Sequence, residues 1–278
     1  MEVTQYSSSL RGLLEGAGDK TVGFVPTMGA LHRGHISLVK AARRKCDVVV
    51  ASVFVNPTQF NDSRDLQTYP RMLDHDLNEL EKAGTDIVFV PSAEEIYPEP
   101  DERVFDFGSI GKVMEGSSRP GHFNGVAQVV SRLFDIVRPD KAYFGEKDFQ
   151  QVAVIKEMVR QLDYNIEIVS CPIIREEDGL AMSSRNMLLE PEYRKAAPLI
   201  YKTLREAVAM KEKESPEEIK SRVISTINKS PYLKVLYFSI VNADSLLEVT
   251  SWREGCPVQG CIAVQAGRVR LIDNIRFQ

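Results

Sequence analysis

Short apolar runs alternate with segments of helical periodicity up to about residue 174. Apolar positions spaced three and four apart, as in the stripe from Val126 to Val137, predict amphipathic helices between the runs. The runs are rich in β-branched residues and predict strands over residues 21–25, 47–55, 86–90, 141–144 and 166–171. Helices between successive strands are typical of βαβ units, so the pattern predicts an α/β fold around a parallel sheet.

The pattern changes after residue 174. Residues 193–213 are predicted as one amphipathic helix, and residues 215–218 have the form of a capped start of another helix. Extended runs follow over residues 233–241, 260–265 and 269–275, with residues 266–268 joining the last two in a predicted hairpin. We therefore expect two domains, residues 1–174 and a smaller α+β domain over residues 175–278.

Composition and charge narrow the class of protein. Hydrophobic residues make up 43% of the 278 residues and charged residues 27%, which excludes collagen-like, low-complexity and wholly disordered chains. The formal net charge of -4 gives no overall attraction for nucleic acid, so no nucleic-acid partner is expected. The longest apolar stretch, residues 48–55, is far shorter than the ~20 residues of a membrane helix, so no membrane partner is expected.

The amino terminus and the cysteines favour a cytoplasmic protein. The first residues lack a basic start followed by an apolar block, so no secretory signal is expected. The four cysteines have no C-x-x-C spacing, which is typical of reduced thiols. We expect no metal site built from the protein's own side chains.

Polar clusters follow the predicted strands, where ligands bind in open α/β sheets. The first cluster, residues 26–35, contains His32 and His35 beside Gly29 and Gly34. Glycines permit close backbone approach, and free N–H groups at a helix start favour a phosphate, to which imidazolium donors would add. The alternative is an ordinary β-to-α turn with two surface histidines.

Two further clusters follow other strands. Asn56 and Gln59 come after residues 47–55, and their amides can hold a polar substrate, although Asn-Pro is also a common turn former. Lys147 and Asp148 follow residues 141–144. Lys147 can neutralise phosphate charge, whereas Asp148 either receives ribose hydroxyls or caps the next helix.

Two loops complete the candidate chemistry. Residues 178–186 place two hydroxyls beside Arg185, which suits a triphosphate, and residues 115–123 contain Gly-Ser-Ser and Arg119 and are a candidate lid. Each composition is also common in ordinary loops.

Five segments match a known motif set in order. They are P-T-M-G-A-L-H-R-G-H at 26–35, F-V-N-P-T-Q-F at 54–60, R-P-G-H-F-N-G-V at 119–126, F-G-E-K-D-F-Q-Q at 144–151 and D-G-L-A-M-S-S-R-N at 178–186. Together they resemble the pantothenate synthetase family, the pantoate–β-alanine ligases, over essentially the whole chain. The wider resemblance is to the HxGH nucleotidyltransferase superfamily. It implies a Rossmann-like, doubly wound parallel sheet followed by a smaller C-terminal α+β domain.

The resemblance also implies roles for individual residues. The catalytic residues would be His35, as proton donor, with His32, Lys147, Ser183, Ser184 and Arg185. The nucleotide would be bound by Met28, Gly29, Ala30, Leu31, His32, Arg33, Gly34, His35, Gly145, Glu146, Lys147, Asp148, Ile174, Met182, Ser183, Ser184 and Arg185. The other substrates would be bound by Pro26, Thr27, Met28, Asn56, Gln59, Arg119 and Gln151. One departure is Asn124, where many relatives place a basic residue.

The implied reaction joins (R)-pantoate to β-alanine with ATP as substrate, giving pantothenate, AMP and pyrophosphate through a pantoyl adenylate. Mg²⁺ would be bound mainly through ATP, and a homodimer would be expected. Another HxGH nucleotidyltransferase is an alternative, but the uncharged amides argue against a phosphorylated acceptor. A non-catalytic nucleotide-binding regulator is a second alternative, which release of AMP would exclude. A dinucleotide oxidoreductase is disfavoured, because no G-x-G-x-x-G follows the first predicted strand.

Overall fold

The computed structural model describes residues 1–60, 63–253 and 255–277. Its strands are β1 (Glu2–Thr4), β2 (Val22–Thr27), β3 (Val48–Val53), β4 (Ile87–Phe89), β5 (Lys141–Gly145), β6 (Glu167–Cys171), β7 (Lys234–Asn242), β8 (Val258–Ala266) and β9 (Val269–Arg276). Its α-helices are α1 (Ser7–Glu15), α2 (Arg33–Arg43), α3 (Ser63–Thr68), α4 (Leu73–Ala83), α5 (Ala93–Ile96), α6 (Met114–Ser118), α7 (His122–Val137), α8 (Phe149–Gln161), α9 (Pro191–Ala196), α10 (Leu199–Met210) and α11 (Pro216–Asn228). Three 3₁₀ helices are η1 (Pro57–Gln59), η2 (Glu146–Asp148) and η3 (Ser184–Leu188).

Six parallel strands among the described residues form the large sheet, in the order β1-β4-β3-β2-β5-β6. The chain moves outward from β2 through β3 to β4, and then returns to place β5 on the other side of β2. The connections therefore reverse direction between β2 and β5. This switch point is where open α/β sheets bind their ligands, because the loops at the strand ends diverge there.

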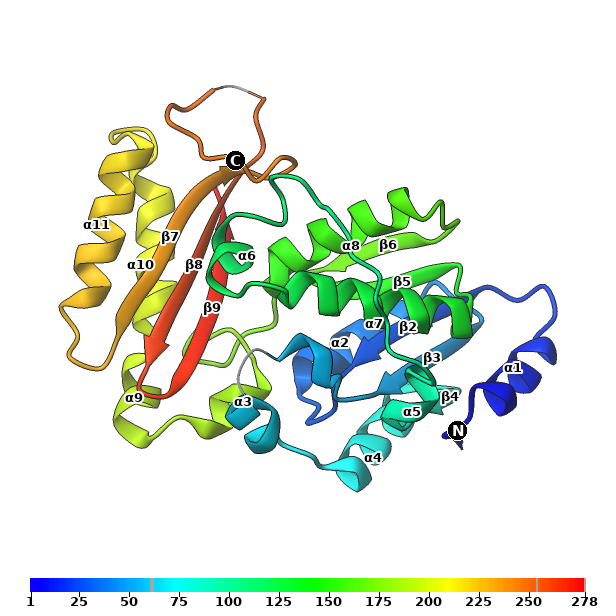
Figure 1. Cartoon of the computed structure of the whole chain (residues 1–278). Coiled ribbons are helices and arrows are strands. Elements are labelled where there is room, and N and C mark those ends of the chain that lie inside the picture. The colour runs from blue at the N-terminus through cyan, green and yellow to red at the C-terminus, as the bar shows by residue number, and fades with distance from the viewer. Residues whose placement is uncertain (61–62, 254, 278) are drawn as a thin grey trace.

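Helices cover both faces of the large sheet (Figure 1). On β2, Phe24 packs into the core beneath α1, α7 and α8, whereas Val25 packs into the core beneath α2 and α4. Successive side chains of a strand point to opposite faces, so a strand covered on both sides is apolar throughout. The predicted doubly wound α/β fold is confirmed.

Strands β7, β8 and β9 form an antiparallel small sheet. Its core includes side chains from α10 and α11, which lie beside the sheet in Figure 1. The predicted helix start is present, because Ser215 and Glu218 form a reciprocal capping box at α11. The β8–β9 turn is one residue tighter than predicted, since Ala266 pairs with Val269 and leaves two residues in the turn. We propose that the chain divides into domains 1–174 and 175–278, supported by the separate cores of the two sheets.

Several elements differ from the sequence-based prediction. The single helix predicted over residues 193–213 is divided into α9 and α10 at Ala197 and Pro198, because proline does not supply a backbone N–H to a continuing helix. Strand β1 was not predicted, since three residues carry too little periodicity to be recognised. The short helices α5 and α6 lie within residues 91–121, a region for which the sequence analysis gave no helix or strand.

Candidate active site

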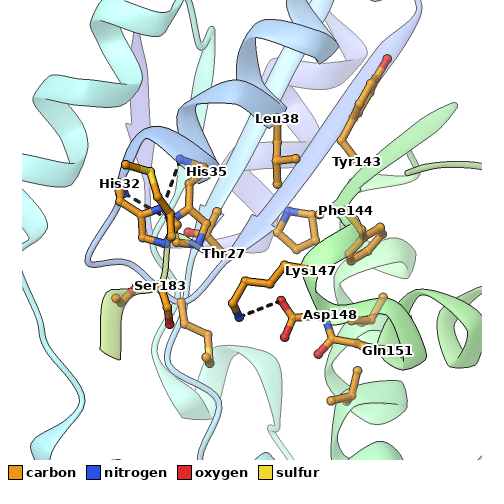
Figure 2. Close-up of a pocket in the computed structure, with 18 of the residues that line it drawn as sticks. Thr27, His32, His35, Leu38, Tyr143, Phe144, Lys147, Asp148, Gln151 and Ser183 are labelled. Carbon is orange, nitrogen blue, oxygen red and sulfur yellow. Dashed lines mark hydrogen bonds and ion pairs between the residues drawn. The ribbon is translucent and has the colours of Figure 1, made fainter. Parts of the chain in front are cut away.

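A cavity of about 220 Å³ lies at the switch point of the large sheet. We call it the inner cavity. The expected site residues that line it are Pro26, Thr27, Met28, His32, Gly34, His35, Asn56, Gln59, Gly145, Lys147, Asp148, Gln151, Ile174, Met182, Ser183, Ser184 and Arg185. Figure 2 shows His32 and His35 on one side of this cavity, and Lys147, Asp148 and Gln151 on the other. The fold thus brings together segments that follow four different strands.

The two histidines form the amino-terminal cap of α2. His32 Nδ1 accepts a hydrogen bond from the Gly34 N–H at 3.1 Å, and His35 Nδ1 accepts one from the His32 N–H at 3.3 Å. Their rings lie 4.1 Å apart. An accepting Nδ1 carries no proton in the neutral ring, so the proton is on Nε2. The helix cap therefore leaves each imidazole with an Nε2–H donor.

Both histidines are neutral at physiological pH in the ligand-free protein. Burial, together with the positive charge of Lys147, lowers the pKa of His32 to about 4. Burial, His32 and Lys147 lower the pKa of His35 well below 6.5. In the ligand-free protein the expectation of imidazolium donors is therefore corrected to neutral N–H donors, because burial, and to a lesser extent the positive charge of Lys147, disfavours the charged rings.

A buried carboxylate, Asp76 of α4, holds the turn before the histidines. Asp76 Oδ2 accepts the Ala30 N–H at 2.9 Å and Oδ1 accepts the Leu31 N–H at 2.7 Å. Gly29 has φ +80, and a Cβ there would lie 2.9 Å from Asp76 Oδ2, so this position requires glycine. These backbone donors, and that of Gly34, are already bonded within the protein. Some of the backbone N–H groups expected to meet a phosphate therefore have other partners.

Lys147, one of the cations that line the cavities, comes from η2, directly after β5. Lys147 Nζ lies 3.6 Å from Asp148 Oδ2, and the lysine side chain is 19% exposed. Both side chains also line a second cavity of about 870 Å³, which extends to β9 and which we call the outer cavity. Lys147 therefore stands where the two cavities meet, a position suited to an extended anion.

Uncharged amides line another part of the inner cavity. Asn56 is buried, donates to the Gly125 carbonyl at 3.2 Å and accepts from the Tyr97 hydroxyl at 3.0 Å. Gln59 Nε2 lies 2.6 Å from Met28 Sδ. Gln151, on α8, also lines the cavity. Such a surface offers hydrogen bonds to hydroxyl and carboxylate groups without adding charge.

Residues 182–186, which we call the serine loop, lie against residues 26–35, which we call the histidine loop. Ser184 is buried and donates to the Ala30 carbonyl at 3.0 Å, so its hydroxyl joins the two loops. Ser183 accepts the Arg185 N–H at 3.3 Å and begins η3. The Arg185 guanidinium lies over the Tyr69 ring at 5.6 Å. Both Ser183 and Arg185 line the inner and the outer cavity.

Some expected site residues do not line the inner cavity. They are Gly29, Ala30, Leu31, Arg33, Arg119 and Glu146. Arg33 is exposed and lies 3.5 Å from Glu176. Arg119 lines the outer cavity, where it approaches Glu115 at 3.7 Å and the His122 ring at 3.1 Å. Asn124, the departure from the family pattern, is bonded to the backbone of Phe105 and Arg103.

Sequence reasoning missed other residues of the site. The apolar lining includes Val126, Val129, Val130 and Leu133 of α7, together with Tyr69. The α7 residues were recognised only as a helical stripe, because periodicity does not distinguish a core contact from a cavity wall. Asp76 resembled the other acidic residues of an amphipathic helix.

Residues 1–60, 63–253 and 255–277 contain neither a cluster of metal-ligating side chains nor a helix that could span a membrane. Among these residues, no group of three or more His, Cys, Asp or Glu side chains could hold a metal ion. None of the helices described is long and apolar enough to cross a membrane.

The fold and the cavity together place the chain in the class of Rossmann-like α/β proteins that have a polar ligand cavity at the switch point of the sheet. The sequence matches the model of the Pantoate-beta-alanine ligase family over residues 2–276. It is 55% identical to a pantothenate synthetase of Porphyromonas gingivalis, with 100% of each chain covered. The chain belongs to the pantoate–β-alanine ligase family, as the motifs indicated.

Solved structures agree with this assignment. The pantothenate synthetase of Thermus thermophilus superposes with a TM-score of 0.94 at 44% identity, covering 100% of this chain and 99% of that one. A pantoate–β-alanine ligase of Francisella tularensis, solved in complex with β-γ ATP and β-alanine, has a TM-score of 0.84 at 37% identity, covering 100% and 98%. The expected family and fold are thus confirmed.

Proposed function

We propose that this enzyme joins (R)-pantoate to β-alanine in two steps, with ATP as substrate and a pantoyl adenylate as intermediate. The observation that carries the proposal is the lining of the inner cavity, where donors for an anion and uncharged amides occur together. Two N–H-donating histidines and Lys147 suit phosphates, whereas Gln59 and Gln151 suit a hydroxy acid without phosphate. An acid and a nucleotide bound together in this way are the reactants of adenylation.

In the first step, the pantoate carboxylate attacks the α-phosphorus of ATP and pyrophosphate leaves. Lys147 offsets the negative charge that develops on the leaving group, and the Nε2–H groups of His32 and His35 donate hydrogen bonds to phosphate oxygens. Neutral donors serve here because they stabilise a phosphate without the mutual repulsion of three adjacent cations. Ser183 and Arg185, which line both cavities, donate further hydrogen bonds to the phosphates.

In the second step, the amine of β-alanine attacks the activated carbonyl and AMP leaves. Asn56 and Gln59 line the inner cavity, and we assign their amides to orienting the two acids. The apolar wall from α7 limits the access of water, which would otherwise hydrolyse the adenylate.

Mg²⁺ enters as its complex with ATP in this proposal. The ion dehydrates reluctantly and is held mainly by phosphate oxygens and water. The homodimer, implied by the resemblance to the family, and the cytoplasmic location, favoured by the cysteine spacing, are further parts of the proposal. Analytical ultracentrifugation of the purified chain tests the dimer.

The order of the two steps predicts an exchange reaction. Enzyme with MgATP and pantoate is expected to move labelled pyrophosphate into ATP in the absence of β-alanine, because the adenylate forms reversibly before the amine is used. The measurement is the label recovered in ATP after the nucleotides are separated. One control omits pantoate. Exchange that persists without pantoate, or that requires β-alanine, contradicts the proposed intermediate.

Gln151 is expected to act on the acid and not on the nucleotide. Gln151→Ala removes an amide that we assign to pantoate, and the loss of a hydrogen bond to a charged group raises the pantoate KM by about 10-fold or more. The ATP KM is expected to change far less. Gln161→Ala, at the exposed end of α8, is the matched control. Equal weakening of both substrates would remove Gln151 from the acid pocket.

A further inference from the structure

Two consecutive polar residues, Asp273 and Asn274, lie buried in β9 of the small sheet. Only 5% and 4% of their surfaces are exposed. A buried carboxylate or amide destabilises the fold unless its polar atoms are hydrogen-bonded. The partners of these two side chains therefore indicate what they contribute.

Asn274 uses its amide on the segment that carries Lys147. Its Nδ2 donates to the Glu146 carbonyl at 2.8 Å and to the Lys147 carbonyl at 3.0 Å. Its Oδ1 accepts from Gln259 Nε2 at 2.6 Å, on the neighbouring strand β8. Two carbonyl oxygens can be met only by N–H donors, so these contacts define the orientation of the amide.

The segment that Asn274 holds has little support of its own. Helix η2 contains three residues, and no side chain caps its start at Gly145. A single 3₁₀ turn has poor hydrogen-bond geometry and does not determine its own position. The amide of Asn274 supplies an anchor from a strand that is 127 residues away in the sequence.

The neighbouring Asp273 holds a second segment of the site in a similar way. Its two carboxylate oxygens accept from Arg175 at 2.7 and 2.9 Å, in a bidentate pair. Arg175 follows Ile174 of the inner cavity and pairs with Ala181, just before the serine loop. Strand β9 thus contacts two of the segments that we assign to the nucleotide.

We propose that Asn274 is a positioning residue, whose amide holds the Glu146 and Lys147 carbonyls so that the Lys147 ammonium meets the phosphates of ATP. This inference rests on the proposed function, because it takes ATP as the ligand of Lys147. It also assigns the small sheet a part in the first step. A lysine displaced by about 1 Å loses much of its effect on a transition state.

The test compares Asn274→Ala and Lys147→Ala, alone and combined, in the pantoate-dependent pyrophosphate exchange. Asn274→Ala is expected to lower the maximum rate by about 10- to 100-fold and to leave the pantoate KM nearly unchanged. When Lys147 is already alanine, adding Asn274→Ala is expected to cost less than about threefold, because the two residues act through the same group. Losses that multiply, or a wild-type rate in Asn274→Ala, overturn the proposal.

A second variant and a stability control separate positioning from folding. Asn274→Asp keeps the size and the acceptor for Gln259, but it turns an oxygen toward the two carbonyls, so it is expected to lose activity as Asn274→Ala does. Thr203→Ala removes a buried hydroxyl bonded to the Leu199 carbonyl within α10. If Thr203→Ala lowers both the thermal midpoint and the exchange rate as much as Asn274→Ala does, the effect of Asn274→Ala is structural and the proposal fails.

Binding of ATP gives a reading that does not depend on turnover. The dissociation constant of MgATP, from equilibrium dialysis, is expected to rise about 10-fold in Asn274→Ala, and the double variant is expected to match Lys147→Ala. If the wild type binds ATP but shows no pantoate-dependent exchange, the proposed function fails while this comparison still decides the role of Asn274. Unchanged affinity in Asn274→Ala, with an unchanged exchange rate, overturns the role.

Discussion

Lys147→Ala is expected to lower the rate of pantoate-dependent pyrophosphate exchange by about 10²–10³-fold, the usual effect of removing one group that stabilises transition-state charge. Lys147 lines both the inner and the outer cavity, beside Asp148. Its charge has its largest effect when pyrophosphate leaves, so the maximum rate falls more than the affinity for pantoate. Exchange kinetics at saturating pantoate measure this effect.

The control for this prediction is Lys156→Ala. Lys156 is exposed on α8, the helix that follows Lys147, and it does not line either cavity. Lys156→Ala removes the same charge from the chain as Lys147→Ala does, but at a position outside both cavities. A similar loss of rate in both variants would assign the effect to net charge, and a wild-type rate in Lys147→Ala would exclude Lys147 from the first step.

His35→Ala is expected to lower the same exchange rate by about 10²–10³-fold. The substitution removes an Nε2–H donor from the inner cavity, and it also removes the acceptor for the His32 N–H. The lost cap is expected to cost about 1 kcal/mol of stability, so the thermal midpoint falls only modestly. Rate and midpoint are therefore measured on the same preparation.

The pKa of the histidines gives this prediction a pH signature. Because the pKa of His32 is lowered to about 4 and that of His35 lies well below 6.5, both rings stay neutral as the pH rises through 6.5. The wild-type rate is then not expected to fall over that interval, where an ordinary histidine loses its proton. His75→Ala, on the exposed side of α4, is the control. A rate that falls with rising pH and an apparent pKa near 6.5 would show that a protonated histidine acts in the first step.

Local chemistry made much of the fold predictable. The strands β2, β3 and β4 are buried on both faces because helices cover both sides, and the resulting apolar runs can be recognised in the sequence without any knowledge of the pairing. The Ser215 capping box was recognised because its two partners are three residues apart. One helix was predicted where there are two, because the amphipathic spacing continues across Pro198. Proline has no backbone N–H for the helical hydrogen bond, so the helix is divided there.

The site was predictable where short segments carry their chemistry in consecutive residues. His32, His35 and Lys147 follow strand ends, and the ends of parallel strands meet at one edge of a sheet. Protonation was predicted wrongly, because the pKa of an imidazole depends on burial and on charges from other segments. Asp76 was missed for the same reason: its partners, Ala30 and Leu31, lie 46 and 45 residues away.

The sequence by itself determined the family, the α/β class and the residue types available for binding a nucleotide and an acid, because these depend on periodicity and on contiguous motifs. Only the tertiary structure decided which of those residues face the cavities. It placed Ser184 between two loops, and it anchored Lys147 through Asn274 of the last strand. Such contacts join residues more than 100 positions apart, and buried hydrogen bonds of that kind leave no local pattern.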